Sequence, residues 1–409
     1  MIHTRGVISD ATGPADPSEL RVSPLELFFD LVFVFTVTQL TDSLAHHLTP
    51  SGLARVLVML AVIWWMYDAF IWLTNALPPV THPRRALLLL GMGGFLIISL
   101  TVPHAFEGGG WAFGWAYLLV IAVHTGLFAG AGVGPGPGPG AGAALGPVAR
   151  MGLLNLLGAT LVVAGGYLEG SAELLLWSAA FALQFAIPYL VDLPRFHLSA
   201  DHFVERHGLV VIIAFGESVI AIGVGVGDTH LTVTLVVTAM LALAVCVGLW
   251  WAYFGQNDDE HAVHVMTALD DARRNRLAIR IYNIGHYLLL LGVILLATGA
   301  KAAVARPTEP LGTARALALA TGVALFLLAN TGIRRTLGLA PLRPRLLAAA
   351  LALAATPLGV EVSALAQVAA TAAVLLATFR YEETARGAGA AAEAVSPGGE
   401  RGRRPAPRR

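Results

Sequence analysis

The sequence has little charge and almost no cysteine. Only 13% of its 409 residues are charged, against about 25% in soluble domains. Hydrophobic residues make up 56%, and the mean hydropathy of +0.71 excludes an ordinary water-soluble globule. The single cysteine, Cys246, excludes an internal disulfide and a cysteine-based zinc site. Basic and acidic residues number 26 each, so no excess positive charge points to a nucleic-acid partner.

Long hydrophobic runs recur along the chain and predict membrane-spanning helices. About 20 apolar residues cross the roughly 30 Å of hydrocarbon, and only helices or closed barrels satisfy the backbone there. The runs lack the alternation of a barrel strand, so we expect an all-α, polytopic transmembrane helix bundle of about twelve spans. The predicted spans are 25–48, 53–77, 85–103, 111–131, 147–169, 172–191, 203–227, 231–254, 278–300, 313–332, 344–360 and 363–380.

Short internal similarities indicate that a six-helix unit occurs twice. The pattern Trp-Trp-x-Tyr at 64–67 recurs at 250–253, although tryptophans at a membrane interface are an alternative explanation. We therefore predict two parallel six-helix repeats, at 21–191 and 192–380. A cytoplasmic N-terminal segment precedes them at 1–20, and a disordered basic cytoplasmic tail follows at 381–409.

The distribution of basic residues predicts the orientation in the membrane. Short cytoplasmic loops carry the excess of arginine and lysine. With the N-terminus inside, 22 of the 26 basic residues fall on the cytoplasmic side, and both termini are cytoplasmic. The basic residues left on the outer side are Arg55, Lys301, Arg306 and Arg315.

Several ionisable residues fall inside the predicted spans, where each charge costs about 2.5 kcal/mol or more. Glu26 and Asp30 are four residues apart and share one helix face, which suits a proton relay, a cation site or a pairing arginine. The alternative for Glu26 is a place in the headgroup layer, where a helix N-terminus favours an acid. The predicted ion- or substrate-binding residues are Glu26, Asp30, Asp68, Glu217 and His286.

A second group of charged residues is expected at the cytoplasmic ends of spans one and seven. Arg21, Glu205, Arg206 and His207 are predicted to form a gate or salt bridges. His202 and His207 are five residues apart and do not form an H-E-x-x-H motif, so no metal site is predicted. No cofactor motif is present, and no nucleophile and base can be paired by spacing, so we expect the protein not to be an enzyme.

Two motifs resemble a known family. Residues 21–35 read RVSPLELFFDLVFVF and residues 201–218 read DHFVERHGLVVIIAFGES. Through them the chain resembles the bacterial low temperature requirement protein A family over roughly residues 20–380. The resemblance implies a multi-pass protein of the bacterial cytoplasmic (inner) membrane and implies no settled biochemical activity.

These observations lead to two functional hypotheses. The first is a transporter or permease with a proton- or cation-binding pathway, whose partners are membrane lipid and an unknown small solute or ion. The second is a non-transporting membrane protein involved in lipid organisation or cold adaptation, in which the same acids hold helices together. The sequence does not determine the oligomeric state.

Overall fold

The computed structural model describes residues 22–130, 147–190, 198–227 and 230–395, and these are helical without any β-strand. The predicted all-α class is therefore confirmed. The helices are α1 (Pro24–His46), α2 (Pro50–Ala76), α3 (His82–Thr101), η2 (Val102–His104), η3 (Ala105–Gly109), α4 (Gly110–Gly130), α5 (Pro147–Gly165), α6 (Ser171–Leu190), α7 (Ala200–Val226), α8 (Val233–Phe254), α9 (Asp258–Thr267), α10 (Asp271–Ala278), η4 (Ile279–Gly285), α11 (His286–Ala305), α12 (Thr313–Thr336), α13 (Arg343–Ala354), η5 (Leu358–Val362) and α14 (Ala364–Val395).

Many of these helices have the length and composition of membrane spans. Ten helical runs in the described residues are long and apolar enough to cross a membrane. One run, His82–Ala129, is 48 residues long and contains both α3 and α4, and Ala149–Gly165 is a shorter apolar helix. The predicted number of about twelve spans and the repeat layout stay predictions.

The 48-residue run is interrupted between α3 and α4. Pro103 lies in the short 3₁₀ turn η2, and Phe106 and Glu107 have non-helical backbone angles. Gly108 has φ +91°, a left-handed conformation that glycine adopts without a clash at Cβ. Beyond this break α4 packs against α3, so the chain turns back within the run.

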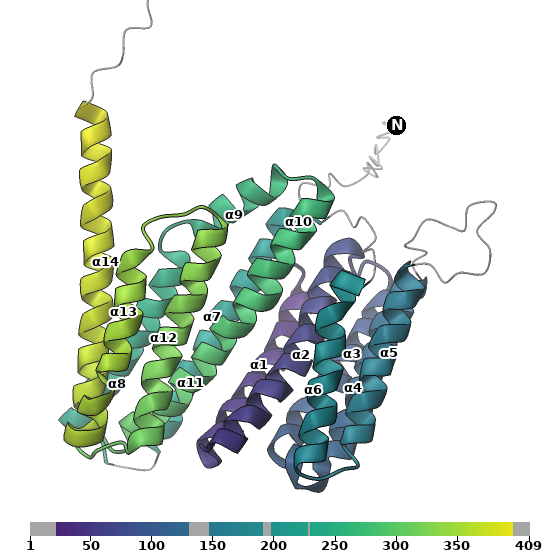
Figure 1. Ribbon diagram of the computed structural model, residues 1–409, viewed down its shortest axis with the longest axis horizontal. Coiled ribbons are helices and arrows are strands. Elements are labelled where there is room, and N and C mark those ends of the chain that lie inside the picture. Colours follow the sequence, from purple (N-terminus) through teal and green to yellow (C-terminus); the bar gives the residue numbers. More distant parts are fainter. Residues whose placement is uncertain (1–21, 131–146, 191–197, 228–229, 396–409) are drawn as a thin grey trace, which may run out of the picture. The chain divides into compact units, whose positions relative to one another are not determined.

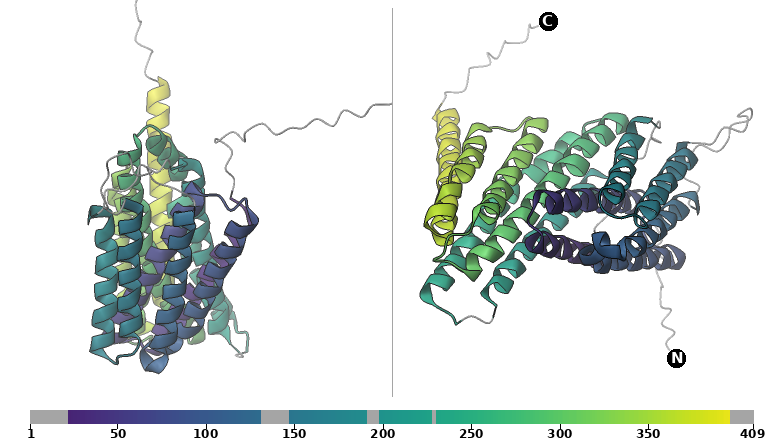
Figure 2. Two further views of the ribbon diagram at one scale, coloured as in Figure 1. Left: turned by 90° about the vertical axis from the view of Figure 1, so that its right-hand side faces the viewer. Right: turned by 60° about the horizontal axis from the view of Figure 1, so that its bottom comes forward.

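Contacts divide the described chain into two compact units that interleave along the sequence. The first unit holds the described residues within 22–36, 61–210 and 259–283, and the second holds those within 37–60, 211–258 and 284–395. In the first unit, α3, α4, α5 and α6 pack successively side by side (Figure 1). In the second unit, α12, α13 and α14 pack in chain order, and α8 contacts α14 (Figure 2, green to yellow). The predicted repeats concern internal similarity, which these contacts do not test.

The C-terminal helix is longer than the last predicted span. That span was predicted over 363–380, whereas α14 begins at Ala364 and ends at Val395. Residues 381–395 are therefore helical, although they belong to the segment predicted as a disordered tail. The alanines in this stretch have high helix propensity, which explains the extension. Residues 1–20 and 396–409 lie outside the described residues.

Close packing of α11 on α12 depends on glycine. A Cβ at Gly322 would lie 2.8 Å from the carbonyl oxygen of Gly292 and would also contact the backbone of Leu296. Small residues allow such close approach of helices in membranes, where packing replaces the hydrophobic driving force. The seam between α11 and α12 therefore requires a residue without a side chain at position 322.

We expect Gly322→Ala to lower the free energy of unfolding by about 1–3 kcal/mol, because the added methyl group meets backbone atoms that cannot move aside. Gly332→Ala is the matched control on the same helix, since a Cβ there has no atom within 4 Å. Chemical unfolding of the purified protein in detergent measures both. Equal stability of the two variants would contradict this account of the seam.

Candidate functional site

Two acids of α1 share one arginine of α7 within the first unit. Glu26 and Asp30 lie one helical turn apart. Arg206 places Nη1 3.2 Å from Glu26 Oε1 and Nη2 2.7 Å from Asp30 Oδ1. The exposed fractions of Arg206, Asp30 and Glu26 are 0%, 1% and 3%. We call these three residues the Arg206 cluster. It is a buried group of two carboxyl groups and one guanidinium.

Glu26 also closes the start of its own helix. The backbone N–H and the hydroxyl of Ser23 donate to Glu26 Oε2 at 2.9 and 2.8 Å, the arrangement of a capping box. Glu26 therefore combines both roles considered from the sequence, because it caps a helix N-terminus and is also buried against Arg206. A capping carboxylate is fixed in place, so its charge has a defined position in the cluster.

His202 lies beside the other oxygen of Glu26. Its Nε2 lies 3.3 Å from Glu26 Oε1, and its Nδ1 lies 3.3 Å from the amide nitrogen of Asn75. The backbone N–H of Ser199 donates to Asn75 Oδ1, which fixes the orientation of the amide. Because the amide nitrogen only donates, Nδ1 accepts and the ring hydrogen is on Nε2. His202 Nε2 then presents its N–H toward Glu26 Oε1.

The Arg206 cluster holds two carboxyl groups and a single positive charge. Tyr67 donates to Asp30 Oδ1, the oxygen that also contacts Arg206. Among the described residues, no donor reaches the buried Asp30 Oδ2. Leaving a buried charged oxygen without a hydrogen bond costs at least about 1–3 kcal/mol. A proton or a small cation at Asp30 Oδ2 would remove both the excess charge and this cost.

A second pair of titratable residues lies deeper in the first unit. His207 Nε2 is 2.8 Å from Asp68 Oδ1, and both side chains are fully buried. The other carboxyl oxygen of Asp68 accepts from the amide of Asn283, a residue of η4. The indole N–H of Trp64 donates to the Asn283 carbonyl oxygen at 2.8 Å and so holds η4 beside α2. Asp68 and His207 are called the Asp68–His207 pair below.

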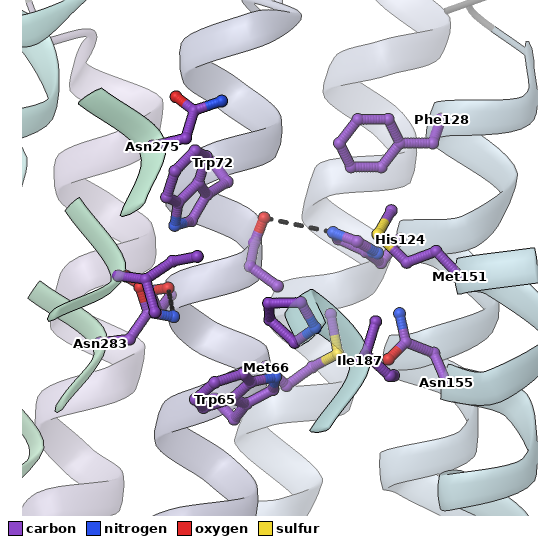
Figure 3. Close-up of a pocket in the computed structure, with 14 residues that line it drawn as sticks. Trp65, Met66, Trp72, His124, Phe128, Met151, Asn155, Ile187, Asn275 and Asn283 are labelled. Atoms are coloured by element: carbon purple, nitrogen blue, oxygen red, sulfur yellow. Dashed lines mark hydrogen bonds between the residues drawn. The ribbon is translucent and has the colours of Figure 1, made fainter. Parts of the chain in front are cut away.

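Asp68 also lines a cavity of about 100 Å³ inside the first unit. Figure 3 shows its side chains converging from α2, α4, α5, α6, α10 and η4. His124 is placed by a contact of 3.2 Å between its Nε2 and the carbonyl oxygen of Ala69. A few polar groups in a mostly aromatic and aliphatic wall are typical of a site for a small molecule. The aromatic and polar lining residues include Trp65, Asp68, Trp72, His124, Phe128 and Asn155.

The second unit contains the other predicted membrane acid. Glu217 is 2% exposed and accepts a hydrogen bond from Thr38 of α1. Lys301 Nζ lies 2.6 Å from Asp42 Oδ1, so the lysine already has a carboxylate partner in this unit. His286 is also buried here, with Nε2 2.8 Å from the hydroxyl of Tyr253.

The structure brings some of the predicted site residues together and separates others. Glu26, Asp30 and Arg206 come together in one cluster, and Asp68 binds His207 in a second. His207, predicted to form a gate or salt bridges, is buried with Nε2 2.8 Å from Asp68 Oδ1. Glu217 and His286 lie in the second unit. Glu205 is exposed on α7, and Arg21 lies outside the described residues.

Comparison with known proteins identifies the family. The family model described as "Bacterial low temperature requirement A protein (LtrA)" matches residues 21–379. The chain belongs to the LtrA family. It is also similar to an uncharacterized protein of Rhizobium meliloti (strain 1021), with 29% identity over 327 residues, covering 78% of each chain. Membership of the LtrA family and the ten apolar helical runs together identify a membrane protein.

Some residues of this LtrA protein's polar clusters were not singled out from the sequence as site residues. Tyr67 and Asn283 each donate to a buried acid. Asn283 is a single amide in an apolar run, and polar residues in such runs are a signal for buried hydrogen bonds. Arg345 and Glu382, a buried ion pair of the second unit, were also missed, because the sequence places both near the ends of predicted spans.

Proposed function

We propose that this LtrA family protein is a transporter or permease with a proton- or cation-binding pathway, and that it is not an enzyme. The observation that carries the proposal is the Arg206 cluster, in which two buried carboxyl groups share one guanidinium. Each buried acid carries a desolvation cost that a neutral side chain of similar size would avoid. Ionisable side chains inside membrane helices commonly mark pathways for protons and ions.

The position of the unpartnered oxygen supports the same proposal. Asp30 Oδ2 is free of hydrogen-bond donors among the described residues, while Tyr67 and Arg206 hold Oδ1 in place. The carboxyl group is thus fixed, yet one of its oxygens remains available for a proton or a small cation. Glu217 is a further buried acid, and we propose that it also binds a proton or cation.

We further propose that the protein lies in the bacterial cytoplasmic membrane with both termini in the cytoplasm. The support is that 22 of the 26 basic residues fall in the two tails and in the connections on the same side as the N-terminus, as the positive-inside rule requires. The partners are membrane lipid and an unknown small solute or ion. The balanced charge gives no support to binding of nucleic acid.

Flux through reconstituted protein tests this function. The purified protein in liposomes is given a pH gradient, and a trapped pH-sensitive dye reports proton entry. In parallel samples, sodium or potassium inside the liposomes provides an ion gradient in place of the pH gradient. We expect Asp30→Asn and Glu217→Gln each to lower the flux about tenfold or more, the effect of about 1.4 kcal/mol on a barrier.

Glu383→Gln is the control for this experiment, because Glu383 is an acid of α14 with an exposed side chain. Its flux should equal that of the unaltered protein. Thermal melting of each variant in detergent identifies any loss of folded protein, and fluxes are compared per folded molecule. Normal flux in both Asp30→Asn and Glu217→Gln would remove these acids from any pathway and would contradict the proposal.

A further inference from the structure

The two ring nitrogens of His207 both face hydrogen-bond acceptors. Nδ1 lies 2.9 Å from the carbonyl oxygen of Phe203, one turn earlier on α7. Nε2 lies 2.8 Å from Asp68 Oδ1. A neutral imidazole has one N–H and one lone pair. It can therefore donate to only one of these two oxygens.

When neutral His207 lies beside an ionised Asp68, each of the two imidazole tautomers brings two hydrogen-bond acceptors into contact. If neutral His207 donates to Phe203, its Nε2 lone pair meets the Asp68 carboxylate at 2.8 Å. If it donates to Asp68, its Nδ1 lone pair meets the Phe203 carbonyl oxygen at 2.9 Å. One proton on the pair removes the conflict, either as imidazolium beside carboxylate or as neutral imidazole beside carboxylic acid.

We propose that the Asp68–His207 pair is a buried proton-binding site that holds one proton. This inference deepens the proposed function and rests on it, because it names the proton as the coupling ion. The proton is shared along the Oδ1 to Nε2 contact. Its release requires Asp68 or His207 to change partners, and the amide of Asn283 can follow such a change by rotating, because it presents either a donor or an acceptor.

The surroundings of the pair include a cavity lined by Asp68 and a π-helical segment that contains Asn283. Asp68, which contacts His207, is also one of the residues that line the cavity. Asn283 lies on η4, a π-helical segment, and such segments are frequent at functional sites. Trp65, Trp72 and Phe128 give the cavity aromatic faces. A small solute bound there would lie beside the protonated group.

Other titratable groups near the pair already have assigned partners or carry no charge. Arg206, which precedes His207 on α7, contacts Glu26 and Asp30. The Tyr282 ring of η4 lies 4.5 Å from the His207 ring, centroid to centroid. His124 of α4 lines the same cavity and contacts the carbonyl oxygen of Ala69. None of these contacts supplies the proton that the hydrogen bonds of His207 require.

His202 provides an internal comparison on the same helix. It is also buried and also lies beside an acid, Glu26, at 3.3 Å. Its other nitrogen faces a donor, the amide of Asn75, so the neutral ring satisfies both contacts. The requirement for an extra proton is therefore specific to His207 and does not follow from burial next to a carboxyl group alone.

Spectroscopy on the whole protein in lipid nanodiscs tests the proposal. Histidine labelled with ¹⁵N distinguishes imidazolium from imidazole by solid-state NMR, and ¹³C-labelled aspartate reports carboxylic acid by its infrared carbonyl band. Near neutral pH we expect one of two signals, corresponding to about one proton per chain. Either an imidazolium signal disappears in His207→Gln, or a carboxylic acid band disappears in Asp68→Asn.

In Asp68→Asn neither a carboxylic acid nor a carboxylate beside the imidazole remains, so either protonation signal should be lost in this variant alone. In His207→Gln an imidazolium signal should be lost, whereas a carboxylic acid band of the buried Asp68 should persist. His202→Gln is the control and should leave both signals unchanged. A neutral imidazole at His207 together with an ionised Asp68 would overturn the proposal.

Proton flux in liposomes separates this inference from the proposed function. If the pair holds a proton but the protein shows no flux, the proposed proton-binding site is supported and the proposed transport function is contradicted. If the flux depends on Asp30 but spectroscopy finds no proton on the Asp68–His207 pair, the transport function is supported and the proposed proton-binding site is contradicted.

Discussion

Replacing Arg206 by glutamine is expected to lower the free energy of unfolding by about 3–5 kcal/mol, the typical cost of removing one partner from a buried ion pair. Arg206 is the only positive group within 4.0 Å of both Glu26 and Asp30 among the described residues. Without it, two buried carboxyl groups one turn apart lose their common partner. The variant should melt at a lower temperature in detergent and should yield less folded protein.

Neutralising the two acids should recover most of the free energy of unfolding that Arg206→Gln loses. In the triple variant Arg206→Gln, Glu26→Gln, Asp30→Asn, no charge remains in the Arg206 cluster, and amides can still hydrogen-bond to Ser23 and Tyr67. Arg273→Gln is the control, because 70% of the Arg273 side chain is exposed. We expect it to change stability by less than about 0.5 kcal/mol. A triple variant as unstable as Arg206→Gln alone would show that the arginine acts through packing and not through charge.

Glu382→Gln in the second unit is expected to lower the free energy of unfolding by an amount similar to that of Arg206→Gln. Arg345 Nε and Nη2 each lie 3.1 Å from an oxygen of Glu382, and both residues are 0% exposed. Arg345 also donates to the Ala252 carbonyl oxygen at 2.9 Å and to Asn330. Removing the carboxylate leaves a buried guanidinium without its counter-charge, which costs about 3–5 kcal/mol.

The neighbouring residues provide matched controls for this pair. Glu383 and Arg343 are exposed, so Glu383→Gln and Arg343→Met should be nearly neutral in chemical unfolding. The double variant Arg345→Met, Glu382→Leu should be more stable than Glu382→Gln, because a buried ion pair replaced by apolar residues loses its desolvation cost. If Glu382→Gln unfolds like Glu383→Gln, the contact between Arg345 and Glu382 contributes nothing to the fold.

The two ion-paired groups differ in a way that bears on function. Arg345 and Glu382 form a bidentate pair of one cation with one anion, in the geometry that matches a guanidinium to a carboxylate. The Arg206 cluster has one cation for two acids and leaves Asp30 Oδ2 without a donor among the described residues. We therefore expect variants at Glu382 to change stability without changing flux per folded molecule, whereas Asp30→Asn should change flux.

Much of the architecture could be predicted from sequence because its causes are local. A run of about 20 apolar residues is sufficient to identify a membrane helix. The capping of α1 by Ser23 and Glu26 follows from their spacing of three residues. The burial of Asp30, Asp68 and Glu217 follows from their positions inside apolar runs. The family could also be recognised from two short motifs that lie on α1 and α7.

Two local features were less predictable. The helical extension of α14 to Val395 depends on propensity at the end of an apolar run, where composition alone suggested a disordered tail. The break between α3 and α4 depends on backbone angles at Gly108 and its neighbours. Both lie at helix ends, where competing conformations differ little in free energy.

The sequence by itself determined the class of this protein, its helices and the presence of acids inside them, because hydrophobicity and helical spacing act between near neighbours. Only the tertiary structure decided which partner each acid has. Asp30 meets Arg206 from 176 residues away, Asp68 meets His207 from 139 and Asn283 from 215. No local pattern encodes such pairs, since they depend on how the helices pack and on which face of each helix turns inward.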